Sequence, residues 1–321
     1  MICGSSTGRL PGQVAYPAVV RAILLVNPQA TSTTAGGRDV LAHALASQVK
    51  LEVVETDYRG HALAVARGAA REGVELVVAH GGDGTVNEVV NGLLADGPGS
   101  RTALGVVPGG SANVFARALG IARDPVEATH HLLRAIEGGR SRTVNLGRAD
   151  ERWFTFNAGL GWDADVVATV ADRRGKQTNA LLYMRAAVAC YFRPPNGKQP
   201  LRVCLPGEEP VEVRTAFVSN TDPWSYLGSR PVHLNTGTSF DGGLGLFALR
   251  ELGLGTIYRH VRQALREDAK HRGKRLLRDD DLEMLSIEAD EPVNFQVDGD
   301  PVGLRTSVKF VSVPHALTVL A

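Results

Sequence analysis

Residues Val77–Leu93, with the sequence VVAHGGDGTVNEVVNGL, decide how this chain folds. An apolar run stops abruptly at Gly81-Gly82-Asp83-Gly84-Thr85, and a helical pattern begins directly after it. Apolar residues then recur at i, i+3, i+4 and i+7, namely Val86, Val89, Val90 and Leu93. This spacing predicts a helix with one apolar face packed on a sheet.

The glycine loop itself indicates a phosphate site. Glycines let backbone N–H groups approach a bulky anion, and a helix N-terminus points a positive dipole end at it. Asp83 would repel a bare phosphate, so we expect a metal ion or a hydroxyl beside it. Thr85 and Glu88 match a T-x-x-E capping box, so helix capping is an equally good interpretation of Thr85 and the better one for Glu88. A phosphate site that needs a carboxylate is a kinase-like requirement.

The first half of the chain alternates strands and helices, which predicts a doubly wound parallel sheet. The expected strands are Arg21–Asn27, Leu51–Thr56, Val74–Ala79 and Ala103–Val107, and the expected helices are Val40–Val49, His61–Glu72 and a third that Asp124 caps and that runs to Glu137. Ligands of such sheets bind at the carboxyl ends of the strands. The strand ends here carry Asn27, Thr56, Gly81 and Gly109, which should converge.

From about Thr143 the pattern changes to short alternating strands, which predicts an antiparallel β-sandwich. The expected strands are Trp153–Asn157, Leu201–Leu205, Val211–Ser219, Leu244–Leu249, Leu282–Glu288, Val293–Val297, Thr306–Val313 and Ala316–Leu320. Helices are expected near Asp163–Arg174, Asn179–Arg193 and Thr256–Glu267. We therefore expect a flexible tail over 1–17, a nucleotide-binding domain over 18–142, a sandwich domain over 143–305, and a return of 306–321 to the first domain.

Composition narrows the classes of function. The formal net charge is +1, so nothing suggests a nucleic-acid-binding surface. Three cysteines without metal-ligand spacing (Cys3, Cys190 and Cys204) fit a reducing compartment. No stretch approaches the roughly 18 apolar residues of a membrane span. Motifs of P-loop enzymes, protein kinases and dinucleotide oxidoreductases are missing.

Three weaker motifs have ordinary structural interpretations. Ser111 in Gly109-Gly110-Ser111 is a natural helix N-cap that could also join a nucleotide site. Asp298-Gly299 is a hairpin signal, and Asp241-Gly242-Gly243 reads in the same way. The charge runs Asp172–Lys176 and Arg266–Asp281 are typical of solvated loops, with contact to anionic lipid headgroups as the alternative.

Taken together in this order, these motifs resemble the diacylglycerol-kinase catalytic family of bacterial lipid kinases, which includes the sphingosine kinases. The resemblance runs from Arg21 to about Leu320 and rests on the following matches: Asn27-Pro28, Thr56, Gly81–Glu88, Asn91-Gly92, Gly110-Ser111-x-Asn113, Asn157–Gly161, Asp241-Gly242 and Asp298–Asp300. It implies a phosphofructokinase-like nucleotide domain followed by a β-sandwich, with ATP and lipid meeting between them.

The resemblance also implies roles for residues of this chain. Asp298 would be the general base, and Asp83 would organise an active-site Mg²⁺. The expected ATP contacts are Asn27, Pro28, Gln29, Ala30, Thr31, Thr56, Gly81, Gly82, Asp83, Gly84, Thr85, Val86, Asn87, Ser111 and Asp300. The expected ligands of a structural Mg²⁺ are Asp241, Thr238 and Gly243. Two positions depart from the family pattern, because Val114 and Gly245 stand where a carboxylate is common.

The expected activity is ATP-dependent phosphorylation of a lipid hydroxyl on a diacylglycerol-like substrate. The resemblance implies ATP, Mg²⁺ and a membrane-derived lipid as ligands, and a cytoplasmic protein that visits the inner membrane surface. A sheet-edge homodimer stays open. The alternatives are a catalytically impaired lipid-binding or regulatory protein and, less favoured, a soluble-substrate kinase of the NAD-kinase type.

Overall fold

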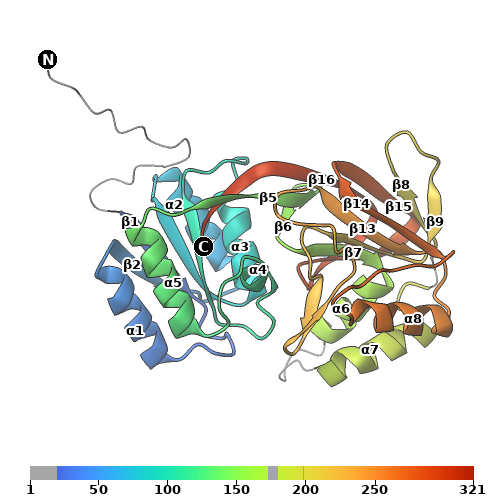
Figure 1. Ribbon diagram of the computed structural model, residues 1–321, viewed down its shortest axis with the longest axis horizontal. Coiled ribbons are helices and arrows are strands. Elements are labelled where there is room, and N and C mark those ends of the chain that lie inside the picture. Colours follow the sequence, from blue (N-terminus) through green and yellow to red (C-terminus); the bar gives the residue numbers. More distant parts are fainter. Residues whose placement is uncertain (1–19, 173–179, 198) are drawn as a thin grey trace, which may run out of the picture.

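The computed structural model of the chain describes residues 20–172, 180–197 and 199–321. The tail expected over 1–17, Cys3, most of the charge run Asp172–Lys176 and the residues around Asn179 lie outside this description. The rest forms two domains side by side, with α1 and α5 at one end of the molecule and α7 and α8 at the other (Figure 1).

A parallel sheet forms the centre of the N-terminal domain, in the order β2-β1-β3-β4, with the end of β16 parallel to β4. Its strands are β1 (Arg21–Val26), β2 (Lys50–Glu55), β3 (Leu76–Gly81), β4 (Ala103–Pro108) and β16 (Asp300–Leu320). Its helices are α1 (Ala35–Ala46), α2 (His61–Arg71), α3 (Asp83–Leu93), α4 (Val114–Ala118) and α5 (Pro125–Glu137).

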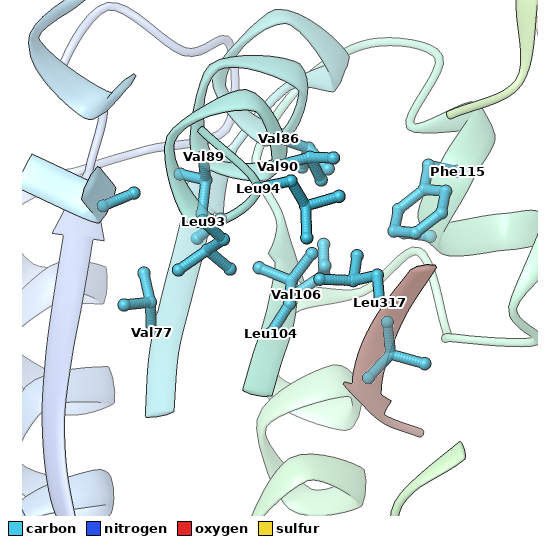
Figure 2. Close-up of a cluster of buried hydrophobic side chains, with 14 of the residues drawn as sticks. Val77, Val86, Val89, Val90, Leu93, Leu94, Leu104, Val106, Phe115 and Leu317 are labelled. Carbon is cyan, nitrogen blue, oxygen red and sulfur yellow. The ribbon is translucent and has the colours of Figure 1, made fainter. Parts of the chain in front are cut away.

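The helices cover both faces of this sheet because alternate strand residues point in opposite directions. Leu24 and Val78 pack with Leu41 of α1 and Leu132 of α5. On the other face, the apolar stripe of α3 packs on Val77 of β3 and on Leu104 and Val106 of β4 (Figure 2). Phe115 of α4 and Leu317 of β16 join the same cluster. This doubly wound arrangement confirms the fold class expected for the first half.

The C-terminal domain is built from antiparallel strands. They are β5 (Arg142–Ala149), β6 (Arg152–Phe154), β7 (Asn157–Gly161), β8 (Leu201–Cys204), β9 (Val211–Val213), β10 (Thr215–Ser219), β11 (Ser225–Leu227), β12 (Arg230–Val232), β13 (Leu244–Leu249), β14 (Leu276–Leu282) and β15 (Met284–Val297). Its helices are α6 (Trp162–Asp172), α7 (Ala180–Phe192) and α8 (Leu254–Ala264).

β15 belongs to both layers of the expected sandwich. Its second half pairs with β7, which continues through β10 and β13 to β14, whereas its first half pairs with β8. A register shift between Glu288 and Val293 separates the two halves. Leu160, Leu246, Ile287 and Phe310 from the different strands share one core. The expected fold of an α/β domain followed by a β domain is therefore confirmed.

The long strands differ from the sequence prediction. Leu282–Glu288 and Val293–Val297 form the single strand β15, and the last two predicted strands form β16, which runs from the second domain into the first (Figure 1). Period-2 alternation does not reveal a bulge within a continuous strand, so each strand was expected as two.

The start of α1 also differs from expectation. α1 begins at Ala35 and not at Val40, because Thr34 caps it by accepting a hydrogen bond from the Gly37 N–H. α5 begins as expected, with Asp124 accepting from the N–H groups of Val126 and Glu127. Among the residues described, no helix combines the length and the apolar character needed to cross a bilayer.

Candidate active site

Two glycine loops meet at the carboxyl ends of β3 and β4. The Gly109 N–H donates to the Gly81 carbonyl at 2.8 Å. A Cβ on Gly110 would lie 2.5 Å from the Cα of Gly82, so the two backbones touch because neither residue carries a side chain. The loop after β1 joins them, since the Ser32 N–H donates to the Gly109 carbonyl at 2.9 Å. The convergence of these strand ends, expected from the sequence, is present.

The N-terminus of α3 opens onto this junction. The first intrahelical bond runs from the Val86 N–H to the Gly82 carbonyl. The N–H groups of Asp83, Gly84 and Thr85 precede it and have no partner within the helix. Three N–H groups and the helix dipole thus point to one place, which suits a phosphate group.

The capping box expected at Thr85 and Glu88 does not form. Gly82 is the N-cap of α3, and its extended backbone lets the helix begin two residues before Thr85. The buried hydroxyl of Thr85 accepts from the Asn27 side-chain amide at 3.0 Å, which links β1 to α3. Glu88 instead accepts from the Gly60 N–H, which leads into α2. Thr85 and Glu88 therefore bind neighbouring segments of the chain and do not cap the helix.

Asp83 lies at the start of α3 with part of its surface exposed. Its Oδ1 accepts a 3.3 Å hydrogen bond from the Phe115 N–H at the start of α4. Burial among protein atoms raises its pKa to about 7, and the nearby carboxylate of Asp298 adds to the rise. Hydrogen bonds from the backbone N–H groups of Phe115, Val114 and Asn113 oppose the rise. A pKa near neutral pH is in the range that suits a general base.

Asp298 lies in the turn between β15 and β16, at a positive φ of 49°, where the expected hairpin is present. Its Oδ2 accepts from the Thr155 N–H, the Thr155 hydroxyl and the Asn87 amide, each at 2.8 Å. Its Oδ1 accepts from the N–H groups of Phe156 at 3.0 Å and Asn157 at 3.1 Å. A carboxylate offers about four lone-pair positions, so five donors saturate it. Burial raises the pKa of Asp298, whereas the hydrogen bonds from Phe156, Thr155 and Asn157 oppose that rise.

These contacts occupy both oxygens of Asp298, and the role of general base that the resemblance implies for it stays a prediction. Its donors come from α3 and from the segment between β6 and β7. The hydrogen bond from Asn87 therefore links α3 of the first domain to Asp298 of the second.

Asn87 takes part in the same set of contacts, and its expected contact with ATP stays a prediction. It is almost fully buried, and its amide donates to Asp298 and to the Trp153 carbonyl. Its carbonyl oxygen accepts from Arg152 at 3.0 Å. Asn91 of α3 also donates to Asn87, so the side chain has partners in both domains.

The remaining expected ATP contacts surround the glycine junction. Asn27 accepts from the Gln29 N–H at 2.9 Å and so shapes the loop from Pro28 through Ala30 to Thr31. The Thr56 N–H donates to the Val26 carbonyl, so Thr56 extends the pairing of β2 with β1. Ser111 is exposed in the second glycine loop. The side chain of Val86 is buried in the core, so only its backbone could reach a ligand. Ser111 is not an N-cap, because Asn113 takes that position at a φ of 50°.

Asp300 lies near the phosphate-facing end of α3. A Cβ on Gly84 would lie 3.2 Å from its Oδ2, and Arg59 lies 3.7 Å from the same oxygen. A carboxylate and a cation therefore flank the N–H groups of α3. Mg²⁺ usually takes one or two carboxylates together with substrate phosphates, so Asp300 fits this ion in the presence of a nucleotide.

Sequence reasoning missed Arg117. Its guanidinium lies 3.2 Å from the ring centroid of Tyr226 and donates to the carbonyls of Gly228 and Ser229. Since Arg117 comes from α4 and Tyr226 from β11, this contact joins the domains on the Asp83 side. A cation on α4 facing an aromatic residue of the second domain has no local sequence signal, because the two are far apart in the chain.

The expected structural Mg²⁺ site does not fit the residues present. The carboxylate of Asp241 is 71% exposed and accepts from Arg142 at 2.7 Å. The Gly243 N–H donates to Asp281, and the buried hydroxyl of Thr238 has no hydrogen-bond partner. A Cβ on Gly245 would lie 2.2 Å from that hydroxyl, so the missing carboxylate has no space. In the described part of the chain, no group of three or more acidic, histidine or cysteine side chains is arranged for a metal.

We expect Mg²⁺ without nucleotide to leave the melting temperature of the protein unchanged, since Arg142 occupies the place of a cation at Asp241. Differential scanning fluorimetry in EDTA and in millimolar Mg²⁺ measures this directly. A rise in melting temperature with Mg²⁺ that Asp241→Asn removes would contradict this assignment, whereas a rise that the variant retains would point to another site.

The chain is similar to known proteins in ways that match this geometry. Residues 21–149 match the model of the diacylglycerol kinase catalytic domain. The diacylglycerol kinase of Bacillus subtilis is 36% identical over 131 residues, 40% of this chain and 41% of that protein. The diacylglycerol kinase of Staphylococcus aureus (strain JH9) is 42% identical over 99 residues, 31% of this chain and 30% of that protein. The matched regions thus span well under half of these relatives.

The likeness in fold extends further than the likeness in sequence. A crystal structure of a diacylglycerol kinase from Bacillus anthracis aligns with 95% of this chain and 98% of its own, with a TM-score of 0.70 and 21% identity. At that identity the likeness concerns the fold alone. It covers the sandwich domain as well as the glycine loops.

Proposed function

We propose that the chain, whose residues 21–149 match the model of the diacylglycerol kinase catalytic domain, is an ATP-dependent lipid kinase. It would transfer the γ-phosphate of ATP to the hydroxyl of a diacylglycerol-like lipid. The observation that carries this proposal is the position of Asp83. A carboxylate with a pKa of about 7 lies beside three helix N–H groups at the junction of the two glycine loops.

The phosphate chain would lie across the start of α3. The N–H groups of Asp83, Gly84 and Thr85 would accept its negative charge, and Gly82 and Gly110 would let it approach the backbone. Mg²⁺ held by Asp300 and the phosphates would neutralise charge when bound. Phosphoryl transfer depends on positioning and charge more than on covalent chemistry, so a site made of backbone donors suits it.

Asp83 would take the proton of the lipid hydroxyl at a carboxylate oxygen. Its pKa lies close to neutral pH, whereas the saturated Asp298 would keep the second domain, with the lipid, in register. This changes the assignment expected from the family pattern, in which Asp298 is the base and Asp83 organises the metal. The lipid would be reached from the cytoplasmic side of the membrane.

The test is incubation of the protein with γ-labelled ATP, Mg²⁺ and a panel of lipid extracts, followed by separation of the lipids. We expect label in a lipid phosphate that is absent from the Asp83→Asn reaction. Transfer of label to a soluble acceptor and to none of the lipids would contradict the proposal and favour the soluble-substrate alternative.

A catalytically impaired lipid-binding protein is the second candidate. Val114 favours it, because this side chain is buried in the core cluster where the family commonly has a carboxylate. ATP binding separates the two, since a lipid carrier should not bind ATP and a kinase must. Isothermal titration with a non-hydrolysable ATP analogue measures this without any reaction.

A further inference from the structure

Two helices of the C-terminal domain expose apolar stripes that the proposed chemistry does not use. On α7, Leu181, Met184, Val188 and Phe192 are all exposed, Phe192 at 67%. Their spacing of three and four residues places them on one face of the helix. The opposite face, with Ala186 and Cys190, packs on α6.

α8 repeats this pattern. Leu254, Tyr258 and Val261 recur at i, i+4 and i+7 and are exposed, Tyr258 at 69%. The inward face of α8 carries Thr256 and His260, which are buried. By comparison, α1 exposes Val40 and α5 exposes Val126.

The two helices that carry the stripes lie in the same part of the C-terminal domain (Figure 1). Both helices lie along the same edge of the C-terminal domain, away from the N-terminal domain (Figure 1). A cavity of about 370 Å³ lies between the end of α7 and the start of α8, and its wall includes Tyr191 and Leu252. The cavity wall also includes Gly161, which is the last residue of β7. The first residue of β7, Asn157, donates a hydrogen bond to Asp298 through its N–H. One strand of five residues, about 13 Å long, therefore connects this part of the domain to the candidate active site.

Positive charge accompanies the stripes. Arg185 lies within the α7 stripe and Arg193 follows it, both exposed, and α7 has no acidic residue. Arg259 and Arg262 flank Tyr258 and Val261 on α8. From residue 250 to residue 275 the chain has eight basic and three acidic side chains, although its net charge is only +1. A local excess of basic residues thus accompanies the exposed apolar side chains.

We propose that the exposed faces of α7 and α8 form a docking surface for an anionic phospholipid bilayer. Apolar side chains would enter the boundary between headgroups and acyl chains, and the arginines would contact lipid phosphates, as in helices that lie in the membrane plane. A second copy of the chain is a poorer occupant, because it would bring two basic clusters together. The inference rests on the proposed function for its purpose, since it names the surface from which a lipid substrate is reached.

The experiment is co-sedimentation of the full chain, without ATP, with vesicles of phosphatidylcholine containing 30% or no phosphatidylglycerol. We expect binding to the anionic vesicles that weakens with salt. Phe192→Asp should reduce that binding about tenfold or more, because the change places a charge where an aromatic ring would be buried in the bilayer. Arg259→Ala and Arg262→Ala, made as separate variants, should each reduce the vesicle binding about fivefold. Val126→Asp, an equally exposed position on α5, is the matched control and should bind like the wild type.

Phosphorylation of lipid dispersed in detergent micelles tests the kinase activity separately from the binding of vesicles. Phe192→Asp should retain the wild-type rate in micelles while losing vesicle binding, which would support the docking surface. Equal vesicle binding by Phe192→Asp and Val126→Asp would overturn it. So would light scattering that shows a wild-type dimer which Phe192→Asp dissociates. Vesicle binding by a protein that phosphorylates no lipid would leave the docking surface standing and reject the kinase.

Discussion

Replacing Asp83 by asparagine should remove most phosphoryl transfer and at the same time make the folded protein more stable above neutral pH. Loss of a positioned general base usually lowers the rate by about 10²–10⁴-fold. ATP should still bind, because the N–H groups at the start of α3 do not depend on the carboxylate. In the wild type, the rate should rise with pH up to about 7 as Asp83 loses its proton, and the residual rate of the variant should not follow that profile.

The stability gain follows from the direction of the pKa shift. Burial raises the pKa of Asp83 in the folded protein from 3.8 to about 7. Between these values the folded state binds more protons than the unfolded state, so stability falls as pH rises through this window. Above pH 7 the full cost of the buried charge is present, and asparagine removes about 1–3 kcal/mol of it after allowance for the partial exposure of Asp83.

Urea denaturation of both proteins at pH 5 and pH 8 measures this difference. Asp163→Asn is the matched control, because burial also raises the pKa of Asp163 to about 7 and Gln296 can still donate to an asparagine oxygen. The Asp163→Asn protein should show the same gain in stability and keep full activity. An Asp83→Asn enzyme with the wild-type rate would exclude Asp83 as the base.

Replacing Asp298 by asparagine should have the opposite effect on stability. The side-chain NH₂ group of asparagine cannot accept hydrogen bonds. At least two of the five donors that now contact the carboxylate would therefore lose their acceptor. Each buried donor left without an acceptor costs about 1–3 kcal/mol, so we expect a loss of about 3 kcal/mol or more. Since the donors come from both domains, the loss should appear in global unfolding.

Thermal and urea denaturation of Asp298→Asn, compared with Asp163→Asn, provide the measurement. Both substitutions remove a buried carboxylate, but only the first breaks a saturated set of hydrogen bonds. If Asp298→Asn were as stable as the wild type and inactive, Asp298 would be the base that the family pattern implies, and the structural role of Asp298 would be rejected.

The part of the site that sequence could predict is the part made by neighbouring residues. Gly81–Thr85 joins a strand to a helix, and its phosphate-binding geometry follows from glycines and from the helix start directly after it. Asp124 could be recognised as a cap for the same reason, since its acceptor and donors lie within three residues.

The rest depends on contacts between distant residues. Asp298 receives its hydrogen bonds from Asn87, 211 positions away, and from Thr155, 143 positions away. From the sequence these are a turn and a residue near a glycine loop, and nothing local indicates that they meet. Arg117 and Tyr226 were missed for the same reason. The pKa of Asp83 likewise depends on burial by both domains, which only the assembled fold provides.

The measurement that tests the central claim most directly is transfer of label from γ-labelled ATP to dioleoylglycerol in mixed micelles, by the wild type, Asp83→Asn and Asp163→Asn in parallel. We predict labelled phosphatidic acid from the wild type and from Asp163→Asn, and at least about a hundredfold less from Asp83→Asn. Equal labelling by all three proteins would contradict the role of Asp83, and no labelling by the wild type would contradict the assignment of a diacylglycerol-like substrate.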